Sequence, residues 1–261
     1  MNNRMIRSGL VTVILFFAFV YYGQARNSPL PCLNKRFSIV AHLVKDTLGN
    51  TNITEADINS AIDSLNIQFA PICVSFEVCE FRTVDNYQYD DLRFDNQSDE
   101  LAIKNRLKSR INMFFTQDFT NEDICGRATL GGIASSGNVF IDKDCTVPGD
   151  FTIAHEMGHF FGLKHTFEEP STQLVDGTDC ETTGDGICDT PADPYVNGIT
   201  ISAYIDMPEC RFISPDKDAN GDFYDPHVGN IMSYYPCACE FTDGQYKKMA
   251  ETYLSSNPKN W

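Results

Sequence analysis

Residues 37–84 contain apolar stretches of two kinds, some with the composition of strands and one with the spacing of a helix. Residues 37–44 and 74–84 are rich in β-branched and aromatic side chains, which is typical of strands. Residues 54–70 between them carry apolar side chains at helical spacing behind Thr54, a good N-cap residue. Strand, helix and strand in this order predict a βαβ unit whose two strands are parallel.

Beyond residue 84 the pattern predicts shorter elements separated by polar loops. Between residues 164 and 229 the periodicity is lost, and Asp, Thr, Pro and Gly dominate. So long a loop is uncommon in a compact domain and usually functional, so disulfides or bound ions would have to hold it. The expected elements are a helix over 100–111, strands over 112–116, 128–130 and 139–142, a helix over 151–162, and a helix over 242–254 that starts with the capping box Thr242 and Gln245.

The first residues have the three parts of a secretory signal. Arg4 and Arg7 precede the apolar run 10–20, and small residues follow at 23–25, which predicts cleavage after Ala25. A membrane anchor is the alternative, but this run is too short to span a bilayer.

Charge and cysteine content narrow the class of protein. The 261 residues carry a net charge of −16, which argues against a nucleic-acid partner and against a polybasic membrane-surface protein. Ten cysteines in a secreted chain imply disulfides, and the absence of a paired C-x-x-C disfavours a cysteine-rich zinc site. Connectivity stays open, but Cys73 with Cys79 and Cys125 with Cys145 are plausible local pairs. The last four cysteines, Cys188, Cys210, Cys237 and Cys239, would hold the C-terminal third, and Cys180 is a further disulfide candidate.

The segment 155–165, HEMGHFFGLKH, carries candidate chemistry. His155 and His159 are four residues apart, so one helix face presents both imidazoles, and Glu156 lies beside them. Gly162 can adopt a positive φ and end the helix, which lets His165 return as a third ligand. Three neutral imidazoles and one water form the open tetrahedral site of a catalytic zinc.

The alternative is a helix with ordinary surface histidines. The same helix is crowded with apolar side chains and therefore reads as buried, and burying two His and a Glu without a partner is costly. We therefore favour the metal centre. The apolar residues are Phe151, Ile153, Ala154, Met157, Phe160 and Phe161.

The motif H-E-x-x-H-x-x-G-x-x-H resembles the zinc signature of the metzincins. Three further blocks resemble the pappalysin family within it: GDGICDTP at 184–191, NIMSY at 230–234 and FTDGQ at 241–245. The resemblance extends from about residue 126 to 254 and implies an α+β fold. Its α/β N-terminal subdomain, about 37–163, would hold a twisted, mostly parallel sheet with an antiparallel edge strand, plus helices. An irregular, disulfide-stapled C-terminal subdomain, about 164–261, would complete the catalytic domain 37–261, after a signal peptide 1–25 and a short segment 26–36.

The resemblance also implies an activity, that of a secreted zinc endopeptidase acting on extracellular proteins. His155, His159 and His165 would bind one catalytic zinc, and Glu156 would be the general base toward a zinc-activated water and then the acid. Met232 would form the floor of the site. Tyr234 would support the oxyanion, although a plain core tyrosine is its alternative. Residues 127–133 would be the edge strand to which an extended substrate adds.

Calcium is a second candidate cofactor, with a structural role. Asp185, Asp189, Thr190 and Asp193 lie in the block where relatives can hold calcium, and a solvated acidic loop is the alternative reading. Residues 216–222 copy the first half of a calcium loop, but its twelfth position is His227 rather than Glu.

Two other functions stay open beside the peptidase. One is a catalytically silent, zinc-stabilised binding or toxin-like module, and the other is a zinc hydrolase of small molecules. The presence of Glu156 with all three histidines favours the enzyme. We expect a monomer with peptide or protein substrates, no nucleic acid and no stable membrane insertion. Whether Cys32 or another group keeps the enzyme latent stays open: the Cys32 thiolate could cap the zinc, but an extracellular cysteine is more often in a disulfide.

Overall fold

The computed structural model describes residues 29–256 apart from 121, 123, 136, 148 and 170. The expected signal peptide lies outside the described residues. Within the part of the chain that is described, no helix combines the length and apolar character needed to cross a membrane.

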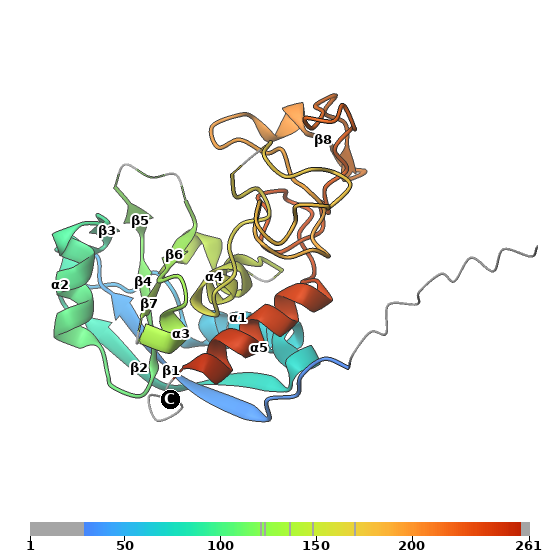
Figure 1. The fold of residues 1–261 in the computed structure, drawn as a ribbon. Coiled ribbons are helices and arrows are strands. Elements are labelled where there is room, and N and C mark those ends of the chain that lie inside the picture. The colour runs from blue at the N-terminus through green and yellow to red at the C-terminus, as the bar shows by residue number, and fades with distance from the viewer. Residues whose placement is uncertain are drawn as a thin grey trace, which may run out of the picture.

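A mixed sheet forms the centre of the larger lobe (Figure 1). Its strand order is β2-β1-β4-β7-β6, and β6 is antiparallel to β7 while the other neighbours are parallel. The expected parallel βαβ unit and the antiparallel edge strand are therefore confirmed. The strands are β1 (Lys35–Val44), β2 (Val74–Val84), β4 (Ile111–Thr116), β6 (Gly126–Ala128) and β7 (Asn138–Asp142).

Helices cover both faces of this sheet. One face packs on α1 (Glu55–Phe69), α4 (Thr152–Phe160) and α5 (Asp243–Ser255), and the other packs on α2 (Asn96–Asn105). Both α1 and α5 begin with a capping box, the second made by Thr242 and Gln245 as the sequence predicts. The short elements are α3 (Gly132–Ser135), η1 (Ala70–Ile72), η2 (Tyr87–Tyr89), η3 (Lys143–Cys145), η4 (Ile201–Ala203), and the strand pairs β3 (Asp91–Leu92) with β5 (Asp118–Phe119) and β8 (Ile205–Asp206) with β9 (Arg211–Phe212).

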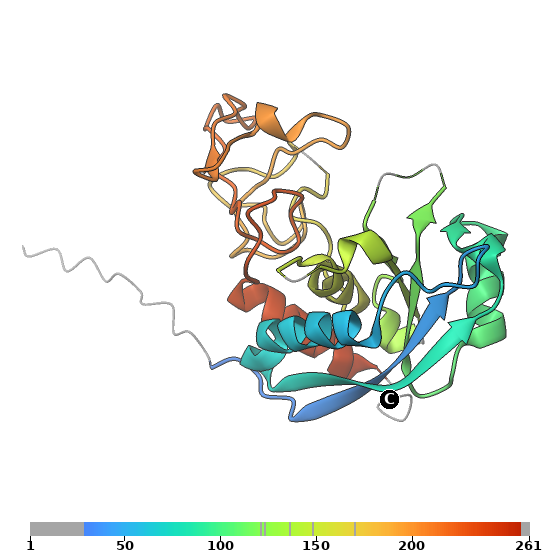
Figure 2. The ribbon, with the colours of Figure 1, turned by 180° about the vertical axis from the view of Figure 1, so that it is seen from behind.

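Most of residues 164–241 form a second, loop-rich lobe beyond α4, seen from both sides in Figures 1 and 2. Its core is an aromatic cluster rather than a sheet or bundle, and the disulfides Cys180–Cys188 and Cys210–Cys237 hold its loops. The cluster consists of Phe167, Tyr195, Tyr204, Ile205 and Tyr235. The residue limits of the subdomains stay predictions.

The predicted pair of Cys73 with Cys79 is wrong. Cys73 is bonded to Cys32, because the parallel register of β1 and β2 sets Lys35 opposite Val74 and so brings the residues before both strands together. The same bond removes Cys32 as a thiolate cap for a metal. Cys79 lies at the bulge between β1 and β2 and has a free, exposed thiol.

Of the other two cysteine predictions, one is confirmed and the other is confirmed in part. The predicted bond between Cys125 and Cys145 is confirmed. Among the last four cysteines, Cys210 bonds Cys237 and Cys188 bonds Cys180, whereas Cys239 is free and exposed.

Two predicted elements are displaced. The helix expected over 100–111 is α2 (Asn96–Asn105), because the Asp95 carboxylate caps the N–H of Gln97 at 2.7 Å and starts the helix earlier. Ile111 then opens β4. The edge strand expected to extend to residue 133 ends at Ala128, and residues 132–135 form α3.

Candidate active site

Helix α4 ends in a way that turns the chain back toward its own side chains. The N–H of Gly162 donates to the carbonyl of His159 and the N–H of Leu163 to that of Gly158, at 2.8 and 2.9 Å. This is a Schellman motif, and it requires the positive φ of +93° that Gly162 adopts. His165 therefore lies beside the two histidines of α4, as the sequence predicts.

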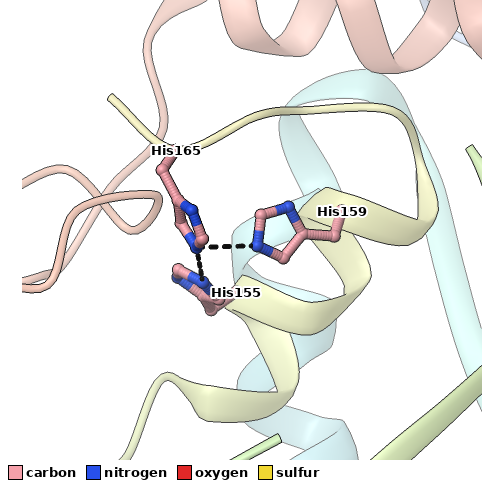
Figure 3. Close-up of side chains that lie close together, drawn as sticks. All are labelled: His155, His159 and His165. Atoms are coloured by element: carbon pink, nitrogen blue, oxygen red, sulfur yellow. Dashed lines mark hydrogen bonds between the residues drawn. The ribbon is translucent and has the colours of Figure 1, made fainter. Parts of the chain in front are cut away.

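The three histidines converge on one point (Figure 3). The Nε2 of His165 is 3.2 Å from that of His155 and 3.0 Å from that of His159. Among the described residues, this is the only group of three or more His, Cys, Asp or Glu whose ligand atoms all lie within 4.8 Å of one another.

Backbone carbonyls orient two of the rings. The Nδ1 of His155 lies 2.7 Å from the carbonyl of Ile231, and the Nδ1 of His159 lies 2.7 Å from that of Leu163. Each Nδ1–H donates to its carbonyl, so each Nε2 lone pair faces the common point. The ring of His165 stacks on Phe167 with centroids 4.6 Å apart.

Burial keeps all three imidazoles neutral. It lowers the pKa of His155 to about 3 and that of His165 to about 2, and the neighbouring histidines lower them further. Burial also lowers the pKa of His159. Neutral imidazole is the form that binds metals.

This donor set fits zinc. With Zn–N bonds of about 2.0–2.1 Å, tetrahedral geometry places ligand nitrogens about 3.3 Å apart. The observed separations of 3.2 and 3.0 Å need little adjustment to reach that spacing. The carbonyl partners of His155 and His159 are of the kind that metal-binding histidines use to fix their tautomer.

Glu156 faces the same cleft from the start of the motif. Its side chain is buried, and its Oε2 has no hydrogen-bond partner among the described residues. Burial raises the pKa of Glu156 to about 8, while the charge of Arg127 and a hydrogen bond from the backbone of Ala128 oppose this rise. Strand β6 passes so close that a Cβ on Gly126 would lie 2.8 Å from Glu156 Cγ.

The segment 230–234 passes beneath the histidines. Met232 is fully buried, and a Cβ on Gly158 of α4 would collide with its Sδ. The side chains of Asn230 and Gln245 exchange two hydrogen bonds of 3.0 Å, and Asn230 Oδ1 also accepts from the N–H of Met232 at 2.8 Å. The sequence pattern does not predict this role of Asn230 and Gln245, although both lie in the family-like blocks.

Tyr234 lies at the edge of the histidine cluster. Its ring is 4.8 Å from that of His165 and 5.8 Å from that of His155, and the residue is 37 % exposed. Burial, and then the charge of Glu156, raise the pKa of Tyr234, so the phenol is protonated and can donate a hydrogen bond at neutral pH.

These groups share an open cleft of about 430 Å³. The edge strand β6 forms one rim, and the loop after α4 forms the other. The lining includes Gly126, Arg127, Ala128, Leu130, His155, Glu156, His159, Lys164, His165, Glu168 and Tyr234.

Of the four candidate calcium residues, Asp185 and Thr190 bond to each other, whereas Asp189 and Asp193 have hydrogen-bond partners outside the set. Asp185 accepts from Thr190 at 2.9 Å, Asp189 accepts from Thr242 and Gly244 at the start of α5, and Asp193 accepts from Thr166 and Tyr235. Asp218 in the second candidate loop accepts from the N–H of Val175, Asn220 and Asp222. Calcium binding therefore stays a prediction.

Comparison with known proteins points to one family. The family model of pregnancy-associated plasma protein-A matches residues 126–254, and a reprolysin-like model of metallopeptidase family M12B matches residues 55–166. An extracellular metalloprotease of Colletotrichum graminicola is 30% identical over 234 residues, which covers 82% of this chain and 72% of the relative. Another from Podospora anserina is 26% identical over 251 residues, covering 88% and 77%.

Among solved structures, metalloproteinase-II from Bacteroides fragilis has a TM-score of 0.38 and 13% identity, over 54% of this chain and 46% of that chain. That likeness is too small to bear on the fold. The sequence relatives and the three-histidine cluster agree with each other. This chain belongs to the pappalysin-type family of metzincin metalloproteases, the family of pregnancy-associated plasma protein-A, and is a metalloendopeptidase.

Proposed function

We propose that the protein is a secreted zinc endopeptidase that cleaves extracellular proteins, with Glu156 as its general base. The observation that carries this proposal is the convergence of three Nε2 atoms in an open cleft beside a buried carboxylate that has an unpartnered oxygen. His155, His159 and His165 would hold the zinc. When bound, zinc acidifies water and polarises a carbonyl.

Residues of the chain would perform the other catalytic roles. Glu156 takes the proton of the attacking water and delivers it to the leaving amine, and its buried position favours such proton transfer near neutral pH. Tyr234 donates a hydrogen bond to the oxygen of the tetrahedral intermediate. Met232 fills the space below α4 and is not a ligand.

Strand β6 supports an extended substrate. Cys125 and Thr129 form backbone hydrogen bonds with Asp142 and Asn138, so this register sets the backbone groups of Gly126 and Ala128 toward the open side of the strand. The N–H of Ala128 donates to Glu156 on that side, so a peptide would pair with the other backbone groups. A peptide can add there as a further strand, which places its backbone across the three histidines.

The disulfide bonds support the proposal that the protein is secreted. Four bonds join eight cysteines of the described chain, which is typical of an oxidising compartment. Curated relatives carry the name extracellular metalloprotease. We propose that cleavage after Ala25 releases the mature chain.

The test is cleavage of a mixed peptide library by residues 26–261, with Glu156→Gln as the matched variant. We expect internal cuts from the wild type, mapped by mass spectrometry, and a loss of about 10²–10⁴-fold in turnover for the variant with its zinc retained. Full activity of Glu156→Gln would refute the general base. A folded, zinc-loaded wild type that cuts nothing would favour the silent binding module instead.

A further inference from the structure

Asp193 is a buried carboxylate that accepts hydrogen bonds from three segments of the second lobe. Its Oδ2 accepts from Thr166 Oγ1 at 2.7 Å, and its Oδ1 accepts from Tyr235 Oη at 2.8 Å and from the N–H of Tyr195 at 3.1 Å. The residue is 4 % exposed. Burial raises the pKa of Asp193, and these three hydrogen bonds oppose the rise because they stabilise the carboxylate form.

Two of these donors are direct chain neighbours of residues in the active site. Thr166 follows His165, and Tyr235 follows Tyr234. The N–H of Thr166 also donates to the carbonyl of Met232 at 3.2 Å, so the two segments are joined at a second point. Asp193 therefore connects the third histidine to the tyrosine of the cleft through a short path of covalent and hydrogen bonds.

Contacts between aromatic rings also link His165 to Tyr234. Phe167 stacks on His165 and contacts Tyr234 edge-on with centroids 4.7 Å apart, and Tyr195 contacts Phe167 at 4.9 Å. His165 and Tyr234 both lie outside regular helices and strands, so backbone ladders do not fix them. A buried acceptor shared by three loops supplies that rigidity.

We propose that Asp193 is a positioning residue that fixes His165 and Tyr234 relative to each other. It touches neither substrate nor metal. This inference rests on the proposed roles of His165 as a ligand and of Tyr234 as an oxyanion donor. Its two hydroxyl partners allow these two roles to be tested separately. The hydrogen bond from Thr166 supports metal binding by His165, and the hydrogen bond from Tyr235 supports turnover through Tyr234.

The test removes one hydroxyl at a time. Thr166→Val should weaken zinc binding about 10–100-fold, as loss of a supporting hydrogen bond near a ligand does, measured by competition with a chromophoric chelator. Tyr235→Phe should lower kcat about tenfold or more with KM and zinc affinity nearly unchanged, because a misplaced Tyr234 affects the transition state. Asp193→Asn, which keeps one acceptor oxygen, should be milder than Asp193→Ala in both measurements.

Tyr204→Phe is the matched control. Tyr204 is another buried tyrosine of the same lobe, and its hydroxyl accepts from the N–H of Val196 at 3.1 Å, but neither residue adjoins a ligand or Tyr234 in the chain. It should lower thermal stability without changing zinc affinity or kcat. If Thr166→Val and Tyr235→Phe behave like this control, Asp193 is merely structural and the proposal fails.

Two further outcomes are distinguishable. A zinc affinity that rises when calcium is added in excess, and that does not rise in Asp193→Asn, would make Asp193 a calcium ligand and overturn the proposal. The zinc titration does not need turnover. A wild type without peptidase activity would thus refute the proposed function, while a weakened zinc affinity of Thr166→Val would still support the link from Asp193 to His165.

Discussion

Asp185 shows how burial and hydrogen bonding compete at one residue. It is 9 % exposed, and burial raises its pKa to about 6, although Ile187 N–H and Thr190 donate to it and oppose the rise. A carboxyl whose pKa is higher in the folded protein stabilises the fold in its protonated form. This contribution is fully present below the unfolded pKa near 4 and is lost as the pH rises through 6.

Asp185→Asn should remove this pH dependence. Between about pH 3.5 and 7, the unfolding free energy of the variant minus that of the wild type should increase by up to about 3 kcal/mol, because only the wild type loses protonation there. Urea denaturation at several pH values, in EGTA, measures the difference. A difference that stays constant with pH would contradict the raised pKa.

At the scale of elements, the end of α4 decides where His165 lies. Gly162 has a φ of +93°, and a Cβ there would also come 2.7 Å from Thr252 Oγ1 of α5. Gly177 has a φ of +69° but no neighbouring atom within 4 Å of such a Cβ. An alanine at position 162 would therefore have both a strained backbone and a collision with α5, whereas an alanine at position 177 would have the strained backbone alone.

Gly162→Ala should lower the unfolding free energy by about 2–4 kcal/mol and also weaken zinc binding, because the turn that returns His165 is distorted. Gly177→Ala should lose only about 1–2 kcal/mol, the strain of a left-handed alanine, and keep its zinc affinity. Chemical denaturation and zinc competition measure both effects. Equal losses in the two variants would rule out the contact with Thr252 as a cause.

The elements also show what the sequence can predict. Strands β1 and β2, helix α4 and helix α5 have long periodic patterns or capping signals, and they were predicted closely. The pairs β3–β5 and β8–β9 consist of two-residue strands, which have no period to detect. The bond of Cys32 with Cys73 depends on strand register, a long-range property that spacing along the chain does not reveal.

The candidate site likewise has one part that the sequence predicts and another part that it does not. One eleven-residue motif brings the three histidines and Glu156 together, because a helix and its Gly turn set their positions locally. The support given by Asn230 and Gln245, or by Asp193, joins segments far apart in the chain. Only the folded structure shows which donor meets which acceptor.

At the scale of the molecule, the candidate metal site lies where the two lobes meet. His155 and His159 belong to α4 in the sheet lobe, whereas His165 begins the loop-rich lobe, whose core is a small aromatic cluster. Bound zinc would thus connect a part with an extensive core to a part with little regular structure. Metal binding is then part of the folding free energy of the second lobe.

Removing zinc should therefore destabilise the second lobe first. At free zinc 100 times the dissociation constant, binding stabilises the native state by about 2.7 kcal/mol, and chelation removes that amount. Limited proteolysis should then cut within residues 164–241 before the sheet lobe. Glu156→Gln should keep the whole response to zinc, because it keeps the three ligands. His165→Ala should behave with or without zinc like the chelated wild type. If chelation left the cleavage rate of the loops unchanged, the lobe would be held by its disulfides and aromatic core alone, and zinc would serve catalysis only.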